Sequence, residues 1–163
     1  MPPSDPLRLA LIQHVVTTIR GINGASQYHY AVKANSVITD LTMSAPNWPV
    51  TELPLFLVEP TNQGSRLYMP AVRIKDSVQL LVTAFHNIDG TAPDRKTTAN
   101  EYLIADLEVA LTQDITRGGR AIDTRLGEPQ PFMDMGSSGG CGVIVPLDIR
   151  VIRTYGNPVG DVS

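Results

Sequence analysis

The chain has 163 residues, a net charge of -3 at pH 7 and one cysteine, Cys141. A chain of this length forms a single domain that buries roughly 68–70% of its unfolded surface without disulfides. One cysteine excludes an internal disulfide, and with it a secreted class built on disulfides, so we expect assembly in a reducing cytoplasm. Basic residues are scattered, which argues against a tight groove for nucleic acid. No apolar run reaches the roughly 20 residues that span a membrane, so we expect a soluble domain over residues 1–163.

The first predicted element is a helix over residues 5–20. Ser4 or Asp5 can cap it, Pro6 suits its first position, and Gly21 follows its last turn. Apolar residues give it a broad face for packing. No basic region precedes that run, so we interpret it as a helix start and not as a signal peptide.

Next, the alternation of Tyr28, Tyr30 and Val32 with more polar neighbours predicts an edge strand over residues 28–33. Prolines indicate an irregular loop over residues 35–50. Within it, Trp48 is either a core residue or an interface anchor.

Three strands are predicted in the middle of the chain. Residues 52–60 form a dense apolar run between prolines, typical of a central strand. After a turn at residues 62–65, a second strand covers residues 66–73. The third, over residues 74–87, is apolar on both faces and is therefore expected at the centre of the sheet.

The clearest amphipathic helix covers residues 97–114, with a start anywhere from Ala92 to Ala99 and an end before Gly118-Gly119. Thr91 and Asp94 resemble a capping box. The face toward the sheet is predicted to hold Asn100, Leu103, Ile104, Leu107, Ala110 and Leu111. The opposite face, which we expect in water, holds Glu101, Asp106, Glu108 and Gln113.

The last part of the chain is predicted to contain a short strand over residues 120–126 and a long strand over residues 143–155. Between them lies a Pro- and Gly-rich loop, residues 127–142. Loops longer than about 12–15 residues are usually functional or mobile. Residues 156–163 are expected to form a loose tail.

This order predicts an α+β fold: a mostly antiparallel sheet with two helices packed on one face. The other face is not fully polar. We expect Leu81, Phe85, Ile144 and Ile152 there, which suits a second surface buried by neighbouring subunits.

The sequence offers no set of residues for catalysis, a cofactor or a metal. The histidines at positions 14, 29 and 86 stand singly, without a cysteine or carboxylate at ligand spacing. Cys141 has no histidine in local register. The Gly-rich segment before it lacks the phosphate-loop and dinucleotide patterns, and Ser137 and Ser138 lack the nucleophile elbow. We therefore expect a protein that is not an enzyme.

Five segments together resemble the tail terminator proteins of long-tailed bacteriophages, also described as minor tail or tail completion proteins. They are DPLRLALIQHVVTTIR, TELPLFLVEPT, RIKDSVQLLVTAF, PDRKTTANEYLIADLEVAL and PLDIRVIRTYGNP. The resemblance spans nearly the whole chain. It rests on the order of the elements and on a general similarity of these segments, and not on an invariant signature.

The resemblance implies a structural virion protein that assembles in the bacterial cytoplasm as a ring, usually homo-hexameric, at the head-proximal end of the tail. The ring stops polymerisation of the tail tube protein and presents the surface for head attachment. Its implied partners are other copies of itself, the tail tube protein and a head-tail connector or stopper protein. DNA passes through the lumen without specific binding.

Candidate contacts with neighbouring subunits, tube or neck lie in two segments: Asn62, Gln63, Gly64, Ser65, Phe132, Met133, Met135, Ser137 and Ser138. Two alternatives stay open. One is a head-tail connector or head-completion protein of the same virion. The other is a small ligand-binding domain or enzyme that uses the Gly-rich loop near Cys141.

Overall fold

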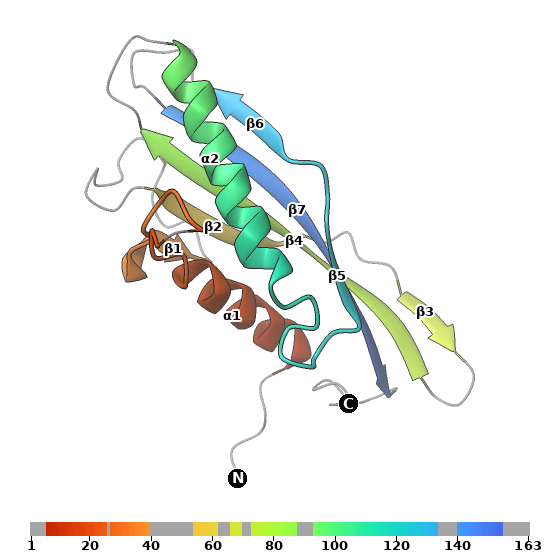
Figure 1. The fold of residues 1–163 in the computed structure, drawn as a ribbon. Coiled ribbons are helices and arrows are strands. Elements are labelled where there is room, and N and C mark those ends of the chain that lie inside the picture. Colours follow the sequence, from red (N-terminus) through yellow and green to blue (C-terminus); the bar gives the residue numbers. More distant parts are fainter. Residues whose placement is uncertain are drawn as a thin grey trace.

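A computed structural model provides the structure of the chain and describes residues 6–25, 27–39, 54–61, 66–69, 73–87, 93–133 and 140–154. Two α-helices lie on one face of a single twisted sheet (Figure 1). The predicted α+β class, with both helices on the same face of a mostly antiparallel sheet, is confirmed. The predictions for Trp48, the turn at 62–65 and the tail at 156–163 fall outside the described residues.

The sheet has seven strands among the described residues. They are β1 (Val37–Ile38), β2 (Leu55–Pro60), β3 (Arg66–Met69), β4 (Arg73–Asn87), β5 (Asp123–Leu126), β6 (Gln130–Met133) and β7 (Gly140–Thr154). A single 3-10 turn, Ala34–Ser36, leads into β1.

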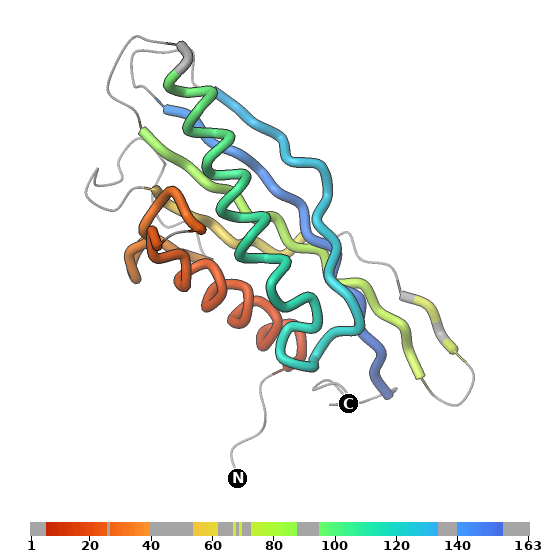
Figure 2. Tube along the Cα trace, in the orientation of Figure 1, coloured from red at the N-terminus to blue at the C-terminus, as the bar shows by residue number. Residues whose placement is uncertain are grey.

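Two long strands, β4 and β7, form the centre of the sheet and pair antiparallel over their whole length. The opposite side of β4 pairs with β2 and then with β3, and the opposite side of β7 pairs with β6 and then with β5. Only β1, which joins β2, makes a parallel pair among these strands. The tube trace shows β3 and the ends of β4 and β7 extending beyond the two helices (Figure 2).

Helix α1 (Leu7–Arg20) begins directly after Pro6 and ends at Gly21, close to the predicted bounds. Its buried side chains lie on one face of the helix, with most of them three or four residues apart: Leu7, Leu11, Val15, Val16 and Ile19. Gly21 keeps a right-handed conformation, with φ of -74°, so the helix does not need it for a left-handed cap.

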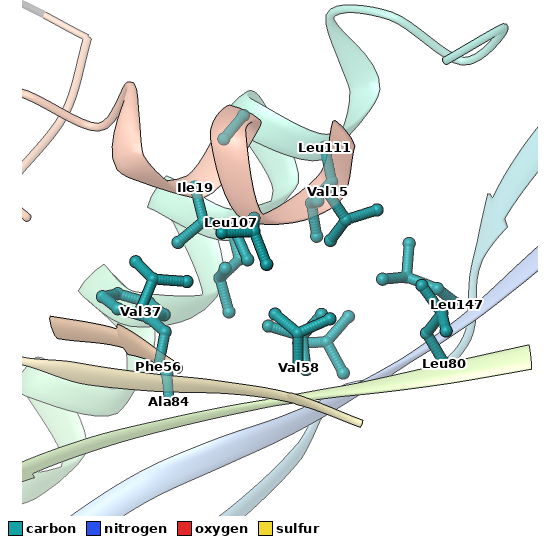
Figure 3. Packing of buried hydrophobic residues seen from close by; sticks show 14 of the residues in the cluster. Val15, Ile19, Val37, Phe56, Val58, Leu80, Ala84, Leu107, Leu111 and Leu147 are labelled. Carbon is teal, nitrogen blue, oxygen red and sulfur yellow. The ribbon is translucent and has the colours of Figure 1, made fainter. Parts of the chain in front are cut away.

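Helix α2 (Pro93–Thr112) starts within the predicted window. Most of the predicted apolar face is buried: Asn100, Leu103, Leu107, Ala110 and Leu111 are buried and Ile104 is half-buried. Ala99 and Asp106, which were not predicted for this face, are buried as well. Figure 3 shows Leu107 and Leu111 with Val15 and Ile19 of α1, above Val58, Leu80 and Leu147 of the sheet. Each buried leucine in such a core contributes roughly 1.5–3 kcal/mol to folding.

Helix α2 ends in a turn of three successive left-handed residues, Arg117, Gly118 and Gly119, with φ of 53°, 69° and 77°. The glycines were predicted as the stop signal, but the arginine was not. Arg117 is fully buried, and its guanidinium donates from Nη2 to the Leu111 carbonyl at 2.7 Å and from Nε to the Thr124 hydroxyl at 3.1 Å. These bonds tie the end of α2 to β5 and hold a non-glycine residue in a conformation that costs free energy.

Three predicted segments differ from the structure. Residues 28–33 do not form a strand; a single bridge between Asn23 and Ala31 is the pairing found there. The strand predicted over 66–73 ends at Met69, and Arg73 already belongs to β4. The segment 127–142 is not one loop, because it contains β6 and the beginning of β7.

Candidate interaction surface

The candidate contact residues divide between described and undescribed parts of the chain. Asn62, Gln63, Gly64, Ser65, Met135, Ser137 and Ser138 lie outside the described residues. Phe132 and Met133 lie on β6, at a margin of the sheet, and the Met133 side chain is 41% exposed. The sequence analysis chose these two residues because they lie in a segment rich in proline and glycine. Their position at the margin of the sheet results from the pairing of β6 with β7.

The sheet face away from the helices is apolar over one half. Strand alternation places Leu81 and Phe85 of β4 on this face, and their register neighbours continue it across the sheet: Leu55 and Leu57 of β2, and Ile144 and Pro146 of β7. Leu55 and Leu57 are buried although they lie outside the core cluster under the helices. The predicted placement of Leu81, Phe85 and Ile144 on a partly apolar second face is confirmed.

Phe132 covers a glycine in this apolar half. Its partner in the register is Gly142 of β7, which pairs on its other side with Phe85. A Cβ atom at Gly142 would lie 2.5 Å from Cζ of Phe132 and 2.3 Å from the Ala84 carbonyl oxygen. The aromatic ring therefore occupies the space where any other residue would place its side chain. Asn100 of α2 holds β6 in place by donating to the Phe132 carbonyl at 3.2 Å.

The other half of the same face is polar. Ser77 donates a short hydrogen bond to Asp148, and the Nε atom of Arg150 lies 3.6 Å from a carboxylate oxygen of Asp148. An open hollow of about 290 Å³ lies here. It is lined by Leu67, Lys75, Asp76, Ser77, Asp148 and Arg150. Ile152, the fourth residue predicted for this face, lies on the polar half opposite Lys75.

On the helix side, Asp106 contradicts its prediction. It was expected in water with Glu101, Glu108 and Gln113, but it is only 1% exposed, whereas those three residues are exposed. Its carboxylate accepts the backbone N–H of His29 at 2.8 Å and that of Tyr30 at 2.9 Å. The Nδ1 atom of His29 donates to the same group at 2.8 Å. The two amides that a strand would have paired with a neighbour are bound to a helix side chain instead.

Aromatic rings extend this polar cluster toward the sheet. The His29 ring stacks on Tyr102 with centroids 4.1 Å apart, and Tyr30 contacts His86 edge-on at 5.1 Å. Burial, followed by the charges of Cys141 and Asp106, raises the pKa of Tyr30 to about 12. Burial also lowers the pKa of His86, although a hydrogen bond to the Asn87 carbonyl opposes it. Both shifts favour the neutral forms of Tyr30 and His86.

Cys141 does not lie in a loop. It is fully buried in β7 opposite His86, and burial raises the pKa of its thiol despite the nearby charge of Lys96. A raised pKa leaves less thiolate, which is the nucleophilic form. The expected Gly-rich loop around Cys141 is therefore wrong for Gly140 to Gly142, because these residues belong to β7.

The side chains that commonly bind metals form no cluster of three or more in the part of the chain that the structure describes. His14 lies 3.4 Å from Asp114, and burial lowers the pKa of His14. No group of three or more histidine, cysteine, aspartate or glutamate side chains converges there as a metal site would require. Neither described helix has the length and hydropathy of a membrane-spanning segment.

Comparison with known proteins adds a similarity of fold. No family model and no curated protein matches the chain. A chain of the solved structure "Virion of native gene transfer agent (GTA) particle" is similar over 89% of this chain and 93% of its own, with 9% identity and a TM-score of 0.49. A likeness at this level carries no conclusion about function.

Proposed function

We propose that the chain is a structural virion protein, the tail terminator of a long-tailed bacteriophage. As a ring at the head-proximal end of the tail tube, it stops polymerisation of the tube protein and provides the surface to which the head attaches. The proposal starts from the sequence resemblance over five segments. It is supported by the apolar half of the sheet face that lies opposite the two described helices.

The apolar half of the outer sheet face carries this proposal. A domain with helices on one side of its sheet needs only that side for its core, and its other side is usually polar. Here Leu81, Phe85 and Ile144, each half-buried, continue an apolar band across two central strands on the face opposite the two described helices (Figure 1). A surface of this kind is typical of contacts between proteins.

The proposal includes no catalytic step. Two residues support a role without catalysis. Cys141 is buried and the pKa of its thiol is raised, which disfavours the nucleophilic thiolate. Burial lowers the pKa of His86, which suits packing and hydrogen bonding better than acid-base chemistry. A head-tail connector of the same virion would use a similar subunit, and no feature of the described residues favours it over a terminator.

Electron microscopy of particles made without this protein tests the proposal. Overlong tubes without heads are the expected result, because uncapped tubes keep adding subunits. Tails of normal length beside detached full heads would instead indicate a connector. Normal intact particles would contradict both structural roles.

Complementation with surface variants then tests the outer face. Leu81→Gln, on the apolar half, should fail to restore normal tails although the isolated variant remains folded. Leu9→Gln is the matched control, because Leu9 is a leucine on α1 with 42% exposure and is remote from this face. Equal rescue by both variants would mean that the outer face makes no essential contact.

A further inference from the structure

The described sheet ends in β1 and β3 on the side of β4 and in β5 and β6 on the side of β7, and the margins at β3 and at β5 and β6 differ in structure. At one margin, β3 pairs with β4 on one side, and no described strand pairs with its other side. At the opposite margin, β5 and β6 pair with β7, and their outer sides likewise have no strand partner among the described residues. Unpaired backbone groups on such edges can bind another strand.

Exposed apolar side chains concentrate at these two margins. Of the seven large hydrophobic side chains that are exposed in the described residues, four lie there. Leu67 and Met69 of β3 are 62% and 38% exposed, and Ile122 before β5 and Met133 of β6 are 51% and 41% exposed. Since an exposed edge strand with apolar side chains favours association, both margins have the composition of contact surfaces.

The directions of the strands at the two margins are compatible. Strand β3 is antiparallel to β4, and β4 is antiparallel to β7, so β3 runs in the same direction as β7. Strands β5 and β6 run opposite to β7. A rotation that continues the sheet from one copy into the next keeps these directions. It therefore brings β3 of one copy alongside β5 of the next as an antiparallel pair.

One margin carries basic side chains, and the other carries charges of both signs. Arg73 and Lys75, beside β3, are exposed and basic. At the other margin Arg125 is bound to Asp123 at 3.0 Å, and the exposed Glu128 adds a negative charge. Pro131 removes one N–H donor from β6, so β5 offers the more complete edge for pairing.

We propose that the partner of each margin is a second copy of this chain: β3 of one copy adds to β5 of the next and continues the sheet between them. Because the two surfaces differ, the contact is heterologous and passes from copy to copy until a rotation closes it into a ring. This inference deepens the proposed function, since ring closure rests on it. The pairing of the edges can be tested without any tail.

Disulfide trapping tests the contact directly in the full chain. Leu67 and Arg125 project from the same sheet face, as their register with Lys75 and Asp148 shows. Facing residues of an antiparallel pair have Cα atoms about 4.5–5.5 Å apart, which lies within the range that a disulfide spans. Variants with Leu67→Cys combined with Arg125→Cys, or with Asp123→Cys, allow for two alignments of the strands.

Oxidation of at least one double variant should give a ladder of dimers, trimers and larger species, because each copy carries both halves of the contact. Each single variant can give at most a dimer, and Cys141 is buried in all of them. The matched control combines Leu9→Cys on α1 with Arg125→Cys and should give no ladder. Absence of a ladder from both test variants, or an equal ladder from the control, would overturn the proposal.

A charge on the edge strand gives an independent measurement. Leu67→Lys should raise the concentration needed for self-association at least tenfold in sedimentation experiments, whereas Leu9→Lys should not change it. Unchanged association of Leu67→Lys, or a wild-type chain that stays monomeric both alone and with tube ends, would contradict edge pairing. If Leu67→Lys still caps tubes, edge pairing is wrong and the terminator role stands. If ladders form but tubes stay uncapped, the role is wrong and the pairing stands.

Discussion

Asp106 and His29 are joined through both backbone and side chain: one carboxylate of α2 accepts the His29 N–H at 2.8 Å and its ring Nδ1–H at 2.8 Å. The same carboxylate accepts the N–H of Tyr30. A buried charge is tolerated in a fold when hydrogen bonds replace its water. This contact therefore attaches the segment after α1 to the middle of α2, across 77 residues of sequence.

Replacing Asp106 with asparagine should lower the free energy of unfolding by about 2–4 kcal/mol, because an amide offers one acceptor oxygen where the carboxylate offers two. Urea unfolding at neutral pH measures this loss. Glu108→Gln is the control, since Glu108 is exposed on the same helix, and it should change stability by less than about 0.5 kcal/mol. Equal effects of the two variants would show that the Asp106 contact contributes little.

Gly142→Ala should lower the free energy of unfolding by about 1–3 kcal/mol, the usual cost of overpacking. The added Cβ would lie 2.3 Å from the Ala84 carbonyl oxygen and 2.5 Å from Cζ of Phe132. Adding Phe132→Ala removes the second clash but leaves the first, because the carbonyl belongs to β4. The double variant should therefore stay less stable than Phe132→Ala alone. If the two are equally stable, the backbone contact is not the cause.

The raised pKa of Tyr30 predicts a loss of stability at high pH. Its pKa is raised from 10.0 to about 12 in the folded chain, so the unfolded chain releases this proton first. The stability that Tyr30 contributes is complete below pH 10 and is lost as the pH rises toward 12. Urea midpoints of the wild-type chain and of Tyr30→Phe at pH 9 and pH 11 measure the effect. The wild-type midpoint should fall further than that of the variant; parallel falls would refute the prediction.

The lowered pKa of His86 predicts that stability falls at low pH. Burial lowers its pKa below 6.5, so the unfolded chain binds a proton first as the pH falls. Stability is therefore complete above pH 6.5 and declines below it. His86→Phe keeps a ring beside Tyr30 and cannot be protonated. Between pH 7 and pH 5 the variant should lose less stability than the wild-type chain, as measured by thermal unfolding, and an equal loss would mean that His86 does not titrate in this range.

The sequence by itself determined the elements whose burial follows a regular period. The spacing of three and four residues in α1 and α2 and the alternation in β4 and β7 correctly assigned the sides that form the core. These patterns are reliable because a helix or strand that runs along one core repeats its exposure at a constant interval.

Where local composition and long-range pairing disagree, only the tertiary structure decided which residues are buried and which segments are strands. Asp106 is polar by composition but buried, because the amides of His29 and Tyr30 supply its hydrogen bonds from a distant segment. Phe132 lies in a segment rich in proline and glycine, yet it is part of a strand because Gly142 of β7 leaves room for its ring. Each outcome depends on a partner far away in the chain, and a local pattern contains no information about that partner.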